Sequence, residues 1–271
     1  MNKTKIFKTI FFSSAVLLLS YACEKLQQEK VDTETQSAVD NAIAEGSFTS
    51  IFPVVNDIGV NDDGVEKTSM LNDSNCYTIT RINKDSVIID YKNGCVDQLG
   101  RLNKGIIIAV FHGKWEEIGS KIVVTFQDFE IDLLKYEGQV TFSRDGEYKF
   151  SRKIEAGKLI NPNWTVLYAG LQTLEQIEGF SKNPSIKDTV ISDNIYRYTG
   201  STAGTNRKGL KYTSEITQPL IKKESCNYIE SGIYQITPDS FPSRIVNFGN
   251  GDCDSKATVT INGKVYDFDL K

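Results

Sequence analysis

The chain has 271 residues, of which 39% are hydrophobic and 24% are charged, and its formal net charge at pH 7 is -4. A mildly acidic chain is a poor nucleic-acid binder, because duplex binding depends on cationic contacts to phosphate. We therefore expect no nucleic-acid partner and no attachment to anionic lipid through charge alone.

The N-terminal segment predicts export and lipid anchoring. Residues 1–9 are basic, residues 10–19 are largely apolar, and the small residue Ala22 directly precedes Cys23. The apolar run is shorter than the roughly 20 residues of a membrane-spanning helix, and no basic flank follows it. The pattern predicts a lipoprotein signal peptide over residues 1–22 and a lipid on Cys23, with an ordinary secretory peptide as the alternative.

A lipid on Cys23 would hold the protein at a membrane without help from the folded part. One acyl chain binds a membrane marginally, whereas two or more hold it stably. Removal of residues 1–22 takes away three lysines and no acid, so the formal charge of the mature chain becomes -7. Residues 23–34 are rich in Glu, Lys and Gln and predict a solvated tether.

Residues 35–75 predict a helical and irregular lead-in to the folded domain. Val39, Ala42 and Ile43 recur at helical spacing. Pro53 then interrupts the apolar pattern. We expect a short helix, then a kinked or irregular segment, and then a polar loop that runs to residue 75.

Residues 76–271 contain two hairpins with clear turn signals. Asn262-Gly263 is the dipeptide that a two-residue type I′ turn needs, and it places Val259 opposite Tyr266. A second turn at residues 144–146 is predicted to have a three-residue loop, which pairs Phe142 with Tyr148.

The whole of residues 76–271 predicts an all-β domain. Residues 105–111 are apolar on both faces and predict a central, buried strand. Short strands, with turns about every eight to twelve residues and no helical crossovers, favour an antiparallel sandwich, barrel or extended meander, preceded by the short helix. One large domain or two related halves are both compatible with this length.

The cysteines predict two disulfides. Four remain when Cys23 carries lipid, and an even number in an oxidising compartment indicates bridges. The midpoint of Cys76 and Cys95 falls on one predicted hairpin turn, and that of Cys226 and Cys253 falls on another. Each pair would lie at the open end of a hairpin, so we predict Cys76–Cys95 and Cys226–Cys253. We predict no zinc site, since four-cysteine zinc sites use closely spaced pairs.

Several motifs together resemble the uncharacterised envelope lipoproteins of Bacteroidota. Besides the lipobox at Cys23 and the acidic helical stretch, they are Ile89-Asp90-Tyr91, Gly94-Cys95, Gly100-Arg101, Lys104-Gly105, Gly119-Ser120, Gly249-Asn250-Gly251-Asp252-Cys253-Asp254 and Asn262-Gly263-Lys264. These motifs are turns and cysteines, so the resemblance implies an envelope location and no known chemistry. It also implies an outer-membrane anchor with the domain exposed at the surface, because Glu24, Lys25 and Glu29 follow the acylated cysteine.

Catalytic motifs are absent from the sequence. It contains no Gly-x-Ser-x-Gly elbow, no phosphate loop and no His-Glu-x-x-His. The only histidine, His112, ends the apolar strand and is interpreted as a strand-end residue. We therefore predict no catalytic residue, no metal and no cofactor. A glycan-active hydrolase stays an alternative, with Glu116 and Glu117 as candidates, because its carboxylates are set by distance in space.

Three aromatic residues are candidate ligand contacts. Trp115, Trp164 and Tyr168 could offer stacking platforms to sugar rings, or they could belong to the core and to cross-strand pairs. We expect a non-catalytic, disulfide-bonded envelope lipoprotein that binds a glycan or an envelope protein. A structural envelope component is the further alternative.

Overall fold

The computed structural model describes residues 31–60, 77–180 and 191–270. The chain divides into two units, Met1–Thr33 and Glu34–Lys271, and all described helices and strands lie in the second. In chain order they are α1 (Gln36–Thr49), α2 (Ile51–Val60), β1 (Thr78–Arg81), β2 (Ser86–Asp90), β3 (Cys95–Val96), β4 (Leu102–His112), β5 (Lys121–Ile131), β6 (Leu134–Arg144), β7 (Lys149–Asn161), β8 (Trp164–Glu178), the 3-10 helix η1 (Ile191–Asp193), β9 (Ile195–Thr205), β10 (Lys211–Lys223), β11 (Ser231–Pro238), β12 (Arg244–Asn250), β13 (Lys256–Ile261) and β14 (Lys264–Asp269).

All fourteen strands of the described residues belong to one antiparallel sheet. Strands that follow one another in the chain are neighbours in the sheet, except that β3 lies off this path and pairs with β4. The sheet is open, with β1 and β14 at its two edges. The predicted all-β class is confirmed, and the architecture is the extended meander.

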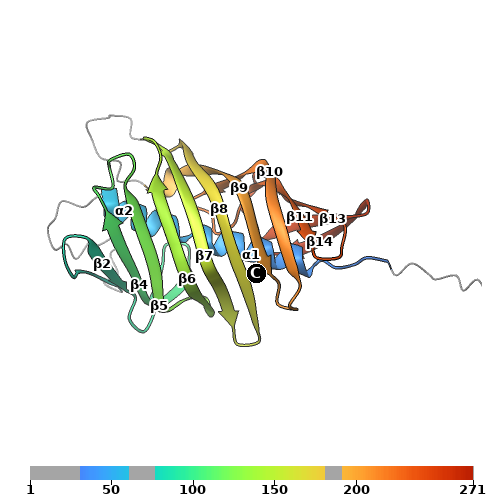
Figure 1. Cartoon of the computed structure of the whole chain (residues 1–271), viewed down its shortest axis with the longest axis horizontal. Helices are drawn as coiled ribbons and strands as arrows, with labels where there is room; N and C mark the ends of the chain where they lie inside the picture. The colour runs from blue at the N-terminus through green and yellow to red at the C-terminus, as the bar shows by residue number, and fades with distance from the viewer. Residues whose placement is uncertain (1–30, 61–76, 181–190, 271) are drawn as a thin grey trace, which may run out of the picture. The chain divides into compact units, whose positions relative to one another are not determined.

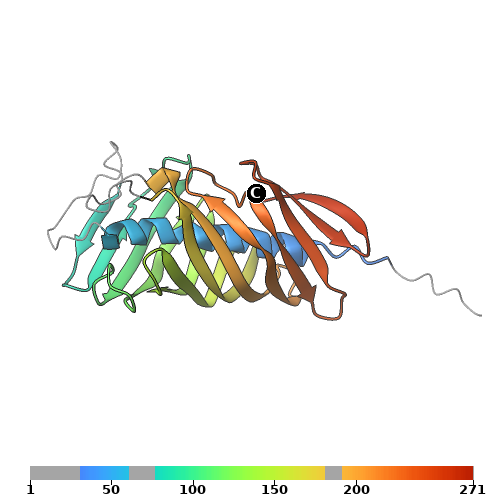
Figure 2. The ribbon, with the colours of Figure 1, turned by 90° about the horizontal axis from the view of Figure 1, so that it is seen from above.

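Helices α1 and α2 run end to end along the concave side of the sheet and cross successive strands (Figures 1 and 2). Of the expected kinked or irregular segment, only a break at Ser50 between α1 and α2 is observed, and the chain around Pro53 is regular helix because Pro53 is the third residue of α2. In the first turn of a helix the backbone N–H has no intrahelical acceptor, so proline loses nothing there. The expected polar loop after α2 lies outside the described residues.

Glycine bulges bend the long strands around the helices. At a register shift between β4 and β5, a Cβ on Gly105 would lie 2.1 Å from the carbonyl oxygen of Asp128. Gly138 of β6 repeats this arrangement against Ala156 of β7, at 2.5 Å. All four residues have positive φ. Because a bulge increases the local bend and twist of a strand, these sites curve the sheet into a trough.

Strand β4 shows how the two faces of the sheet differ. Its inward residues Ile107, Ala109 and Phe111 are buried beneath the helices, whereas its outward residues are only partly buried. The prediction of a strand covered on both faces is therefore wrong, since in the described part of the chain only the concave side carries a second layer. Its apolar outer side chains face solvent.

The structure confirms the predicted register of one hairpin and contradicts that of the other. The Asn262-Gly263 turn is confirmed, with Val259 opposite Tyr266. The predicted three-residue loop at 144–146 is wrong, because Phe142 pairs with Arg152 and residues 145–148 connect β6 to β7. The observed register differs from the predicted one by an even number of residues, so it keeps the same side chains on each face.

Candidate functional site

The predicted disulfide between Cys226 and Cys253 is confirmed, with the two Cα atoms 5.7 Å apart. Cys95 is buried in β3 and is disulfide-bonded. Its predicted partner Cys76 and the lipidation residue Cys23 lie outside the described residues, so that pairing and the lipid stay predictions.

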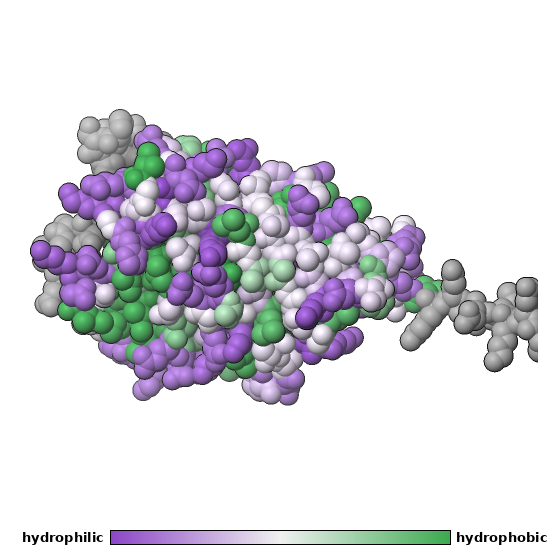
Figure 3. All heavy atoms as spheres, in the orientation of Figure 1, coloured by the Kyte–Doolittle hydropathy of each residue, from purple (hydrophilic) through white to green (hydrophobic). Residues whose placement is uncertain are grey.

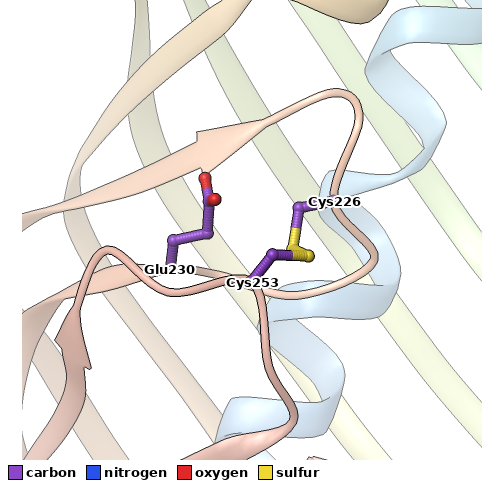
Figure 4. A group of neighbouring side chains, drawn as sticks. All are labelled: Cys226, Glu230 and Cys253. Carbon is purple, nitrogen blue, oxygen red and sulfur yellow. A yellow bond between two sulfur atoms is a disulfide. The ribbon is translucent and has the colours of Figure 1, made fainter.

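The confirmed bridge lies beside a buried carboxylate, as Figure 4 shows. The ligand atoms of Cys226, Glu230 and Cys253 lie within 4.8 Å of one another. The carboxylate of Glu230 accepts a hydrogen bond from the backbone N–H of Lys223 at 3.1 Å and contacts the Lys223 ammonium at 3.4 Å. Because a metal-binding cysteine must be a thiolate, the bridged pair acts as a structural link between the loops that carry it.

The predicted aromatic contacts take part in packing. The ring of Trp115 is buried, and its Nε1–H donates to the side-chain oxygen of Asn56 at 2.9 Å. Tyr168 is buried on the concave face. Trp164 is partly buried, and the Arg207 guanidinium lies 4.1 Å from its ring centroid. The structure thus brings none of these three rings together as an exposed platform.

The histidine and the two candidate catalytic carboxylates of the predicted hydrolase alternative lie at one end of the sheet. His112 is the last residue of β4 and is exposed. Glu116 and Glu117 are exposed in the turn that follows. A hydrolase needs its carboxylates on either side of a bound glycosidic bond, and these two are adjacent on an exposed turn.

A buried polar cluster between α1 and the sheet was not predicted from the sequence. The carboxylate of Glu45 pairs with the Arg152 guanidinium at 2.5 Å and accepts a hydrogen bond from the side-chain amide of Gln172 at 2.8 Å. The Tyr168 hydroxyl also donates to Glu45, and Arg152 donates to Thr49 at 2.9 Å. We call these five residues the Glu45 cluster.

The electrostatics of the Glu45 cluster fit a structural role. Glu45 is 2% exposed and Arg152 is fully buried. Burial, and after it the negative charge of Glu45, raise the pKa of Tyr168 well above its ordinary value, so the phenol stays protonated and donates. Buried charges of this kind must be paired and hydrogen-bonded, and the observed contacts meet that requirement.

Further polar contacts hold the N-terminal part of α1. The buried Asp40 accepts an ion pair from Arg207 at 2.6 Å. Asn41 accepts a hydrogen bond from Thr202 at 3.0 Å and donates to Ser214 at 3.5 Å. α1 is therefore fixed to β8, β9 and β10 through specific polar contacts.

The outer face of the sheet carries a group of partly exposed apolar side chains at its β2 to β5 end. Ile88 of β2 is directly opposite Ile108 of β4, and Val110 of β4 is directly opposite Val123 of β5. Together with Ile106, these partly buried side chains form a group that we call the aliphatic patch. Figure 3 shows hydrophobic surface gathered over this part of the face.

Comparisons with known proteins give no information on the function of the site. No protein-family model, no curated protein and no solved structure matches this chain. Among the residues that the structure describes, none of the helices has the length and hydrophobicity needed to cross a membrane.

Proposed function

We propose that this protein is a lipid-anchored, non-catalytic binding protein of the outer membrane, attached through Cys23 and exposed at the cell surface. In this proposal, its sheet binds an envelope protein through the aliphatic patch. The observation that carries the proposal is an apolar cluster on the face that no other layer covers in the described residues. Contiguous exposed apolar surface on a soluble domain marks an interaction site.

One cross-strand row shows how local the patch is. The row runs through Val110, Val123, Thr141, Lys153 and Leu171 of β4 to β8. It is apolar in β4 and β5 and becomes mixed from β6 onward. The patch is thus a distinct feature of one end of the sheet.

The chemistry of the patch favours a protein partner. Its side chains are β-branched aliphatics on adjacent strands, which give a rigid apolar surface, and Asp90 lies at its margin opposite Ile106. The concave side, where an open sheet could hold a small apolar ligand, is occupied by α1 and α2 (Figure 2). A protein surface with an apolar centre is the complement of a patch of this kind.

Position-specific photo-crosslinking in cells tests the proposal. A photoreactive amino acid at Val110 should give one defined adduct, and the same group at Thr199, exposed on the same face in β9, should give none. The double variant Ile108→Thr/Val123→Thr keeps β-branched side chains and should abolish the adduct without lowering the melting temperature strongly. Cys23→Ser should move the protein from the membrane to the soluble fraction.

Two outcomes would contradict binding through the patch, and a third would contradict surface exposure. Equal adducts from Val110 and Thr199 would show that the patch has no special role. An adduct that persists in the double threonine variant would show that its apolar surface is not needed. Protection of the domain from protease on intact cells would contradict surface exposure alone.

A further inference from the structure

A second feature of the outer face lies away from the aliphatic patch, across β8 to β11. It is an open hollow with a volume of about 510 Å³. Its outward-facing lining forms two cross-strand rows, one with Ala169, Ala203, Thr213 and Thr237, and one with Leu171, Ser201, Glu215 and Gln235. Figure 3 shows surface of intermediate hydropathy over this part of the sheet.

Small residues make the hollow. Ala169 and Ala203 are directly opposite each other, so the surface falls close to the backbone between them. Between Ala169 and Leu171, Gly170 faces the concave side, where a Cβ would lie 2.8 Å from the Thr202 side chain. Beneath the floor, Thr202 and Ser214 are tied to Asn41 of α1. The floor is therefore fixed from below and does not depend on a flexible loop.

Polar groups line the hollow without engaging one another. Among the described residues, the side chains of Ser201, Thr213, Glu215 and Gln235 have no hydrogen-bond or ion-pair partner. Three other outer-face carboxylates of the central strands are paired. Glu155 contacts Lys153 at 2.7 Å, Glu175 contacts Arg197 at 2.5 Å, and Glu137 contacts Lys158 at 3.0 Å. Glu215 thus presents an unpaired carboxylate at the edge of a hollow.

The lining chemistry narrows the class of ligand. It contains no lysine, arginine or histidine, so an anionic ligand would meet no counter-charge. It contains one carboxylate, which is too few for a cation site of oxygen ligands. Hydroxyl, amide and carboxylate groups alternate with methyl groups and with Leu171, which is 61% exposed. That mixture suits a ligand with hydroxyl groups along its edges and C–H groups on its faces.

We propose that this hollow binds a neutral glycan. Sugar hydroxyls would donate to Glu215 and Gln235 and accept from Ser201 and Thr213. The C–H face of a sugar would pack on Ala169, Ala203 and Leu171. The hollow lies within the range of about 300 to 1,000 Å³ in which small-ligand sites occur. This second site goes beyond the proposed protein-binding function, which concerns a different part of the sheet.

A glycan array probed with the full-length protein in detergent tests the inference. The wild-type chain should bind a defined subset of neutral oligosaccharides, and the best of them should be titrated by calorimetry. Ala203→Tyr fills the hollow from an exposed position and should weaken binding by on the order of tenfold or more, which is about 1.4 kcal/mol. Glu215→Ala should weaken binding as well.

The matched control is Thr199→Tyr. Thr199 lies on the same strand and the same face as Ala203 but outside the hollow, so this variant should bind like wild type. Melting curves show whether each variant is folded. The inference is overturned if the wild type binds none of the neutral glycans, or if a folded Ala203→Tyr binds them unchanged. It is also overturned if Ala203→Tyr instead abolishes only the crosslink to a protein partner, since the hollow would then belong to a protein interface.

Discussion

The two ends of the interface between helix and sheet are built on different chemistry. At the α2 end, the ring of Phe52 lies 5.1 Å from that of Phe142, 4.9 Å from that of Phe150 and 5.4 Å from that of Tyr196. At the α1 end, the central contact is the buried ion pair of Glu45 and Arg152. The same helix–sheet interface is thus apolar at one end and polar at the other.

The two ends contribute differently to the stability of the fold and to the placement of α1 on the sheet. Apolar burial stabilises roughly in proportion to area and has little directional preference. A buried ion pair adds little net stability, but it is satisfied in only one arrangement of helix and sheet. We infer that the α2 end supplies much of the burial energy and that the Glu45 cluster fixes the register of α1 on the strands.

The largest effect is expected from breaking the polar end. Arg152→Ala leaves the Glu45 carboxylate buried without its counter-charge, so the free energy of unfolding should fall by about 4 kcal/mol. Chemical denaturation followed by circular dichroism measures this loss. The exposed pair offers a control, because Arg197→Ala removes a partner of Glu175 at the surface and should cost less than about 1 kcal/mol.

A double variant tests whether the stability lost in Arg152→Ala comes from the unpaired charge of Glu45 or from lost packing. Glu45→Leu/Arg152→Met replaces both charges with apolar side chains of similar length and should recover most of the stability lost in Arg152→Ala. Failure of this double variant to recover any stability would contradict the assignment of the loss to an unpaired charge.

A smaller loss is expected at the apolar end. Phe52→Ala removes a fully buried ring that contacts three others, so the free energy of unfolding should fall by about 3 kcal/mol. Phe52→Leu keeps most of the apolar volume and should recover part of this loss, as thermal and chemical denaturation can show. A loss as large for Leu as for Ala would indicate that ring contacts matter more than volume.

Local signals in the sequence predicted the local parts of this fold. The Asn262-Gly263 turn needs positive φ at both positions, and both have it, so its register could be predicted from the dipeptide. The pairing of Cys226 with Cys253 followed from a single hairpin. The openness of the sheet could not be predicted, because each strand pattern is the same in a meander, a sandwich or a barrel.

The site residues that were missed lack a local signal. Glu45 and Arg152 are 107 residues apart, and Arg152 stands between Ser151 and Lys153 as a surface charge would. Alternation shows that residues share a face, but it does not show which face is buried when both carry polar groups. Alternation leaves the face of Tyr168 open, and Trp115 lies in the turn after β4, where contacts with Asn56 and Phe150 place its ring inside.

The smallest predicted effect concerns a partly buried titratable group beside the helix–sheet interface, whose backbone N–H donates to the carbonyl oxygen of Asn194 at 3.0 Å. Glu224 follows β10 and interacts with Tyr198, whose ring lies 5.5 Å from the Arg152 guanidinium. Burial raises the pKa of Glu224 from its ordinary value of 4.5 to about 7, although Lys222 and Arg101 act in the opposite direction. Its Oε1 atom is buried and has no hydrogen-bond partner among the described residues.

The sign of the pH dependence follows from this shift. The folded state binds the Glu224 proton more tightly than the unfolded state, so the stabilisation is complete below pH 4.5 and is lost as the pH rises through about 7. Glu224→Gln stays neutral, so it should match wild type at low pH and be more stable at pH 8. We expect a difference of about 1 to 2 kcal/mol, because the residue is partly exposed and its charge is partly screened.

Denaturant midpoints measured across this pH range for wild type and Glu224→Gln provide the measurement. Glu215→Gln removes an exposed carboxylate from β10 and should leave the wild-type pH profile unchanged. Parallel profiles for wild type and Glu224→Gln would show that Glu224 is not the titrating group. A steeper profile in wild type alone would assign the pH sensitivity to Glu224.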